Sequence, residues 1–162
     1  MLDSKECSLL SYDGNGRLLW TSACIEGTFR ILGQRWLRIP GLNGLLSGIY
    51  LSCSDRVLVL TERQGDLLAV PLDASSISCN PPSEATFELS WAEDQVARIL
   101  RPHGRGGAVC IVRLSPRLYA TSGRDGRYCT YSIEYQERNA LKLELLTASK
   151  AARNMEWIER VR

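Results

Sequence analysis

The chain has 162 residues, enough for one ordinary domain, and its hydrophobic share of 44% is typical of a packed globular protein rather than a disordered one. The 20 Lys and Arg residues against 18 Asp and Glu give a formal charge of +2, which excludes the strong positive field of a general nucleic-acid binder. Most basic residues are arginine, which suits phosphate contacts, but codon bias in a GC-rich genome is the simpler explanation.

The six cysteines are scattered, with no Cys-x-x-Cys pair and no neighbouring histidine, so the spacing of a zinc site is absent. They are Cys7, Cys24, Cys53, Cys79, Cys110 and Cys129. The polar, charged start of the chain does not resemble a signal peptide, and no apolar segment is long enough to span a membrane. We therefore expect a cytoplasmic protein with free thiols and without a metal or other cofactor.

The first predicted element is a hairpin over residues 7–23, because an Asp-Gly-Asn-Gly turn joins two apolar segments. Residues 24–48 are less regular, and glycines interrupt the apolar positions, so one or two short strands with exposed loops are expected there. Within this stretch Trp36 lies between Arg35 and Arg38. It is a candidate stacking platform for a base, with packing between sheets as the common alternative.

The next segment repeats the pattern of a later one. Residues 56–72 align with residues 117–133 at an offset of about 60 residues, longer than the roughly 40–45 residues of common four-stranded repeats. The Ser, Asn and Pro content of residues 74–90 predicts an inserted loop that accounts for the excess. Residues 91–102 are either a short helix or an outer strand, and the pattern favours the strand.

The clearest strand pattern follows His103. Three strands are expected over residues 108–114, 117–122 and 127–134. The last two are joined by the turn Gly-Arg-Asp-Gly at 123–126, which supplies glycines able to adopt positive φ. Alternating leucines predict an outer strand over residues 140–147, with a short helix as the alternative, and residues 155–161 resemble the first strand of a further sheet.

A four-stranded sheet of this size is not stable alone and must pack against a neighbour. The repeated pattern predicts an all-β fold, a partial WD-repeat-type β-propeller of about three four-stranded antiparallel blades. The blades are expected over residues 1–48, 49–102 and 103–147, with the start of a further blade at 148–162. Closed propellers need about four to eight blades, so we expect a fragment that is poorly soluble or self-associates.

Four residues match the buried hydrogen-bonded chain of a WD repeat. In that repeat a histidine precedes the first strand, Ser or Thr lies on the second, an aspartate lies in the turn and a tryptophan lies on the third. Here His103, Thr121 and Asp125 match, and Tyr131 replaces the tryptophan, with Ser122 as the alternative to Thr121. Such groups are tolerated in a core only when each is paired, so we predict a structural tetrad.

The same histidine also permits an enzymatic interpretation, in which His103, Asp125 and Ser122 form a hydrolase triad. However, the sequence around Ser122 predicts a turn and not the strand-to-helix corner of a nucleophile elbow. The chain is therefore expected not to be an enzyme.

Arginines flank the two loops of this repeat. Arg101 and Arg105 precede its first strand, and Arg124 and Arg127 flank the turn between its second and third strands. Exposed on a rim, they could contact tRNA phosphate or an acidic partner, although solvated charges without a partner are the usual case. The glycines at 104–107 do not form a phosphate loop, because no Gly-Lys-Ser/Thr follows them.

The last third of the chain resembles a known family. The His-Gly opening at 103–104, the turn at 123–126 and the Asn-Met-Glu-Trp segment at 154–157 are similar to WD-repeat proteins that act as non-catalytic partners of the anticodon-loop tRNA 2′-O-methyltransferase. The resemblance covers residues 103–162 and implies a multi-propeller protein that binds the methyltransferase subunit and helps present tRNA. Methyl donor and catalytic residues would belong to the partner.

The alternative function is a generic propeller module for protein–protein interaction in trafficking, signalling or ubiquitin-ligase assembly, because one fold hosts many functions.

Overall fold

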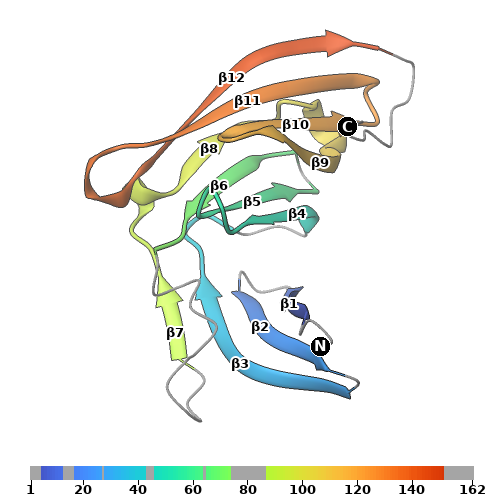
Figure 1. Cartoon of the computed structure of the whole chain (residues 1–162). Coiled ribbons are helices and arrows are strands. Elements are labelled where there is room, and N and C mark those ends of the chain that lie inside the picture. Colours follow the sequence, from blue (N-terminus) through green and yellow to red (C-terminus); the bar gives the residue numbers. More distant parts are fainter. Residues whose placement is uncertain are drawn as a thin grey trace.

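A computed structural model describes residues 5–12, 17–26, 28–42, 46–63, 65–73 and 87–151. Three four-stranded β-sheets lie side by side (Figure 1). We name them sheet A (β1-β2-β3-β7), sheet B (β4-β5-β6-β8) and sheet C (β9-β10-β11-β12), and sheet B lies between the other two. The described part of the chain contains no helix long and apolar enough to cross a membrane. The prediction of an all-β fold made of four-stranded sheets is confirmed.

Sheet A differs most from expectation. Its strands are β1 (Lys5–Tyr12), β2 (Arg17–Glu26), β3 (Thr28–Arg38) and β7 (Phe87–Ser90). The predicted hairpin is present as the antiparallel pair β1–β2, but β3 is a single long strand where one or two short ones were expected. Residues 87–90, predicted to belong to an inserted loop, instead pair in parallel with β3. The chain thus returns from sheet B to cover an open strand edge, whose backbone groups need partners.

Sheet B contains β4 (Leu46–Ser52), β5 (Val57–Glu62), β6 (Leu67–Pro71) and β8 (Ala97–Ile99), in antiparallel pairs. Every residue of β5 and β6 is buried, which explains why their sequences are continuously apolar rather than alternating. Within residues 91–102, the favoured strand is present as β8, preceded by a short 3₁₀ turn, η1 (Glu93–Gln95).

Sheet C matches the prediction closely. It contains β9 (Ala108–Ser115), β10 (Leu118–Gly123), β11 (Arg127–Tyr135) and β12 (Leu141–Lys150), all antiparallel. The outer strand expected over 140–147 is confirmed and continues to Lys150. The strand predicted over 155–161 lies outside the described residues.

Two apolar cores hold the sheets together. Adjacent residues of a strand point to opposite faces, so Leu58 and Leu60 of β5 pack toward sheet A while Val57 and Val59 pack toward sheet C. The first core also contains Leu18, Leu37, Ile39, Leu42, Leu68, Val70 and Leu72, and the second contains Leu67, Ala69, Ala97, Tyr119, Cys129, Tyr131, Ile133 and Leu141. Sheet B therefore contributes to both cores, and each outer sheet packs against sheet B through one of them.

The β5–β6 turn of sheet B is in close contact with the loop that precedes β9. Gly65 has a φ of +117°, and a Cβ atom added there would lie 2.2 Å from the carbonyl oxygen of Gly104. We expect Gly65→Ala to lower the free energy of unfolding by about 2 kcal/mol, through a strained φ and separation of the two loops. Urea denaturation measures this change. Gly106→Ala is the matched control, because its added Cβ meets no atom within 4 Å. Equal stability of the two variants would contradict the expectation.

Candidate functional site

His103 lies at the centre of a chain of polar contacts in sheet C. It directly precedes the 3₁₀ turn η2 (Gly104–Gly106) that leads into β9. Its Nδ1 is 3.0 Å from Asp125 Oδ1, and its Nε2 is 2.7 Å from Thr121 Oγ1. Thr121 Oγ1 is in turn 2.9 Å from the hydroxyl of Tyr131. The structure therefore brings together all four residues that the sequence suggested for the tetrad.

The donors and acceptors of this chain run in one direction. A carboxylate only accepts, so His103 Nδ1 carries the proton and donates to Asp125. In the tautomer with its proton on Nδ1, Nε2 accepts from the Thr121 hydroxyl, and Thr121 Oγ1 then accepts from Tyr131. Burial raises the pKa of Tyr131 above its ordinary value, consistent with a phenol that stays protonated and donates. His103, Thr121, Asp125 and Tyr131 are thus each paired within this network.

Ser122 does not join His103. Successive residues of a strand point to opposite faces, so Ser122 points away from Thr121, and its buried Oγ has no hydrogen-bond partner. Thr121, not Ser122, therefore occupies the second position of the chain. The two nitrogens of His103 are both used by other residues, so the His103–Asp125–Ser122 triad is not assembled.

The arginines that flank the two loops lie on one rim. The contact between His103 and Asp125 joins the two loops, which therefore lie on the same side of sheet C. The four side chains are exposed: Arg101, Arg105, Arg124 and Arg127. A fifth exposed arginine, Arg63, lies in the β5–β6 turn of sheet B, which touches the same loop through Gly65 and Gly104. The alignment of residues 56–72 with 117–133 already placed Arg63 opposite Arg124, and that signal could have identified it.

Trp36 does not belong to this group. It lies half-buried on β3 of sheet A and pairs with Leu19 and Glu88 of neighbouring strands. The arginines that precede and follow the sheet C strands are separated from it by sheet B. Trp36 therefore remains a separate candidate and does not form one surface with the arginine rim.

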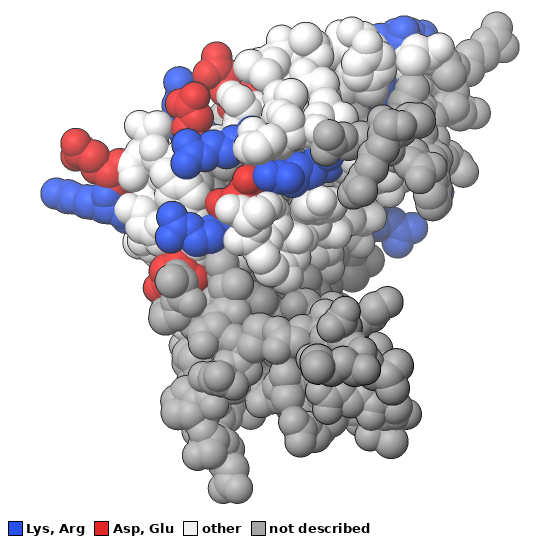
Figure 2. Space-filling model, in the orientation of Figure 1, with Lys and Arg blue, Asp and Glu red and all other residues white. Residues whose placement is uncertain are grey.

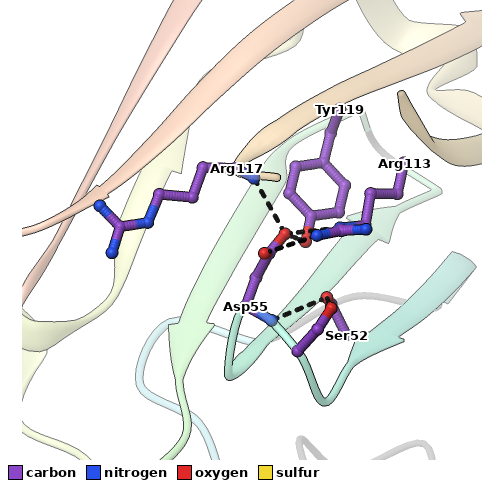
Figure 3. A network of polar contacts seen from close by, with 6 residues as sticks. Ser52, Asp55, Arg113, Arg117 and Tyr119 are labelled. Atoms are coloured by element: carbon purple, nitrogen blue, oxygen red, sulfur yellow. Dashed lines mark hydrogen bonds and ion pairs between the residues drawn. The ribbon is translucent and has the colours of Figure 1, made fainter. Parts of the chain in front are cut away.

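Sequence reasoning missed a second polar network, which joins sheets B and C (Figure 3). Asp55, in the β4–β5 turn, accepts two hydrogen bonds of 2.8 Å from the Arg113 guanidinium and one of 2.6 Å from the Tyr119 hydroxyl. The backbone N–H of Arg117 donates to the same carboxylate at 3.0 Å, and the N–H of Asp55 donates to Ser52 Oγ at 3.2 Å. Asp55 thus acts as a bridge between neighbouring sheets.

The charges of this bridge reinforce one another. The Arg113 guanidinium hydrogen-bonded to Asp55 holds the pKa of that carboxyl well below its usual range, and the Asp55 carboxylate raises the pKa of Arg113 in return. Burial, together with the hydrogen bond to Asp55, raises the pKa of Tyr119.

A neighbouring contact also joins sheets B and C. Arg56 follows Asp55 in the β4–β5 turn, and its carbonyl oxygen accepts from the hydroxyl of Tyr135 on β11. The guanidinium carbon of Arg56 lies 5.7 Å from the centroid of the Tyr135 ring.

The remaining features that bear on function are the surface charge, the cysteine thiols and the arrangement of metal-binding residue types. On the face shown in Figure 2, the basic and acidic side chains of the described residues lie beside each other among uncharged residues. The cysteines whose side chains are described, Cys53, Cys110 and Cys129, are free thiols. Within the described ranges, no group of three or more His, Cys, Asp or Glu side chains is arranged to hold a metal ion.

Similarity to known proteins is visible in the structure alone, since no protein-family model and no curated protein sequence matches the chain. Sqt1 of Saccharomyces cerevisiae is similar with a TM-score of 0.51 and 12% identity, over 86% of this chain and 34% of Sqt1. Hsv2 of Kluyveromyces lactis is similar with a TM-score of 0.54 and 9% identity, over 87% of this chain and 43% of Hsv2. A second structure of Hsv2 from Kluyveromyces lactis is similar with a TM-score of 0.51 and 10% identity, over 91% of this chain and 48% of Hsv2.

The chain thus spans about a third to a half of the solved structures that it matches. Both proteins are WD-repeat β-propellers. At these identities the similarity concerns the fold, and it agrees with the three adjacent four-stranded sheets and with the His103 hydrogen-bond chain. The chain therefore has the fold of a partial WD-repeat-type β-propeller, whose described blades do not close into a ring.

Proposed function

We propose that this chain is part of a non-catalytic, cytoplasmic WD-repeat scaffold that supports 2′-O-ribose methylation of the tRNA wobble nucleotide. It would bind the methyltransferase subunit, tRNA or both, and it would supply neither the methyl donor nor a catalytic residue. The motif resemblance over residues 103–162 motivates the choice of reaction.

One structural observation supports a scaffold role most directly. His103 and Asp125, which a hydrolase triad would use for acid–base chemistry, take part in a structural hydrogen-bond chain, while exposed arginines lie on the adjacent rim. Buried, fully paired polar groups stabilise a blade, and exposed guanidinium groups are suited to phosphate or carboxylate partners.

The test reads the methylation itself. In cells lacking the gene, we expect mass spectrometry of tRNA to show loss of the wobble 2′-O-methyl group, which re-expression of the wild-type protein restores. A variant with Gln at Arg101, Arg105 and Arg127 should restore it poorly, whereas Arg138→Gln, a change at an exposed arginine in the β11–β12 connection, should restore it fully. Unchanged methylation in the cells lacking the gene would reject the tRNA role and leave the generic interaction module.

A further inference from the structure

A pocket of about 380 Å³ lies on the arginine rim, between the blades of sheets B and C. The residues that line it are Leu46, Ser47, Arg63, Gly106, Val109 and Arg124. They come from the starts of β4 and β9, the β5–β6 turn, η2 and the β10–β11 turn, so every wall is supplied by a strand end or a tight turn. The pocket is therefore a property of the junction between two blades and not of either blade alone.

Close backbone contacts fix the shape of this pocket. Gly107 has a φ of +66°, and a Cβ added there would lie 2.8 Å from the carbonyl oxygen of Glu62, so the η2 loop is in tight contact with the end of β5. Ser47 Oγ donates to the Thr61 carbonyl oxygen at 3.2 Å and lies 3.0 Å from Thr61 Oγ1. A ligand would enter a preformed site and would not have to order the loops around it, which favours binding.

The lining combines positive charge with an apolar wall. Arg63 is exposed and makes no ion pair with another residue of the described part of the chain, whereas Arg124 already has a contact and adds charge nearby. Leu46 and Val109 are half-buried and aliphatic. A guanidinium matches a carboxylate in charge and geometry, and the aliphatic wall matches a side chain such as leucine or valine.

We propose that this pocket binds an acidic segment of a protein partner, with an Asp or Glu carboxylate on Arg63 and an adjacent aliphatic side chain against Leu46 and Val109. The inference rests on the proposed scaffold function and names the chemistry of its protein partner. RNA fits less well, because unpaired bases are commonly held by aromatic stacking and no aromatic residue lines the pocket.

The experiment measures fluorescence anisotropy of the full chain with a dye-labelled peptide, Gly-Glu-Glu-Leu-Asp-Glu-Gly. Its matched control peptide has Gln and Asn in place of the acidic residues and should bind at least about fivefold more weakly. Arg63→Gln should weaken binding of the acidic peptide by at least about fivefold, because a charge-assisted hydrogen bond is lost. Arg138→Gln, which alters an exposed arginine outside the pocket, should leave the affinity unchanged.

Two results would overturn the inference. One is equal affinity of wild type and Arg63→Gln for the acidic peptide, when the two proteins unfold at the same urea concentration. The other is binding of a single-stranded RNA oligonucleotide, lost in Arg63→Gln, without binding of the peptide, which would make this a nucleic-acid site. Either outcome leaves the tRNA methylation test standing, because that test reads modification in cells and does not depend on the peptide.

Discussion

Replacing Asp55 with alanine is expected to lower the free energy of unfolding by about 3 kcal/mol. The Asp55 side chain is only 7% exposed, and its removal leaves the Arg113 guanidinium and the buried Tyr119 hydroxyl without their shared acceptor. A polar group left unpaired in a buried position costs more than the net worth of the bond it made. Urea denaturation followed by tryptophan fluorescence measures the change.

The control for this variant is Glu144→Ala. Glu144 pairs with Lys142 at 3.3 Å on β12, but both side chains are 57% exposed, and exposed ion pairs contribute little. We expect a change below about 0.5 kcal/mol. If Asp55→Ala proved as mild as Glu144→Ala, the bridge between sheets B and C would have no stabilising role.

Lowering the pH should also reduce the contribution of Asp55 to the unfolding free energy of the wild-type protein. The folded-state pKa of Asp55 is depressed, chiefly by Arg113, so the carboxylate contributes fully above its unfolded pKa of about 3.9. That contribution is lost progressively as pH falls below this value toward the folded pKa. The difference in stability between wild type and Asp55→Ala should therefore shrink as the pH is lowered from about 5 to about 3.

Thr121→Val is expected to cost about 3 kcal/mol of unfolding free energy, although the two side chains have nearly the same shape. The substitution removes the hydroxyl that links His103 Nε2 to the Tyr131 hydroxyl, and all three residues are buried. Two polar groups are then left in the core without partners. The same urea titration reports the loss.

The double variant Thr121→Val with Tyr131→Phe separates this cause from a change in packing. Removing the tyrosine hydroxyl as well leaves fewer unpaired groups, so the double variant should be more stable than Thr121→Val alone by about 1 kcal/mol. A double variant less stable than the single one would show that the hydroxyls do not act through their mutual bond.

Sheet C was predictable because its signals are local. The Gly-Arg-Asp-Gly turn and the alternation along residues 127–134 specify strands and a hairpin within a short stretch. The same stretch suggested Asp125 together with either Thr121 or Ser122, and the structure selects Thr121, because successive residues of a strand point to opposite faces. The hydrogen-bond chain around His103 could therefore be predicted from the sequence, because its members lie within one repeat.

The remainder depends on contacts between distant residues. Asp55 lies in an ordinary polar turn, and its partners Arg113, Arg117 and Tyr119 lie 58, 62 and 64 residues further along the chain. Likewise, residues 87–90 follow a segment rich in Ser and Pro, and only their pairing with β3 reveals a strand. No local pattern encodes either arrangement.

The position of β7 links the order of synthesis to the order of assembly. Sheet A receives its outermost strand from a segment that the ribosome makes after β4, β5 and β6. The β3 edge must therefore stay unpaired while the next blade emerges, and sheet A is completed only when the chain doubles back. The first two blades are consequently expected to form as a single cooperative unit and not one after the other.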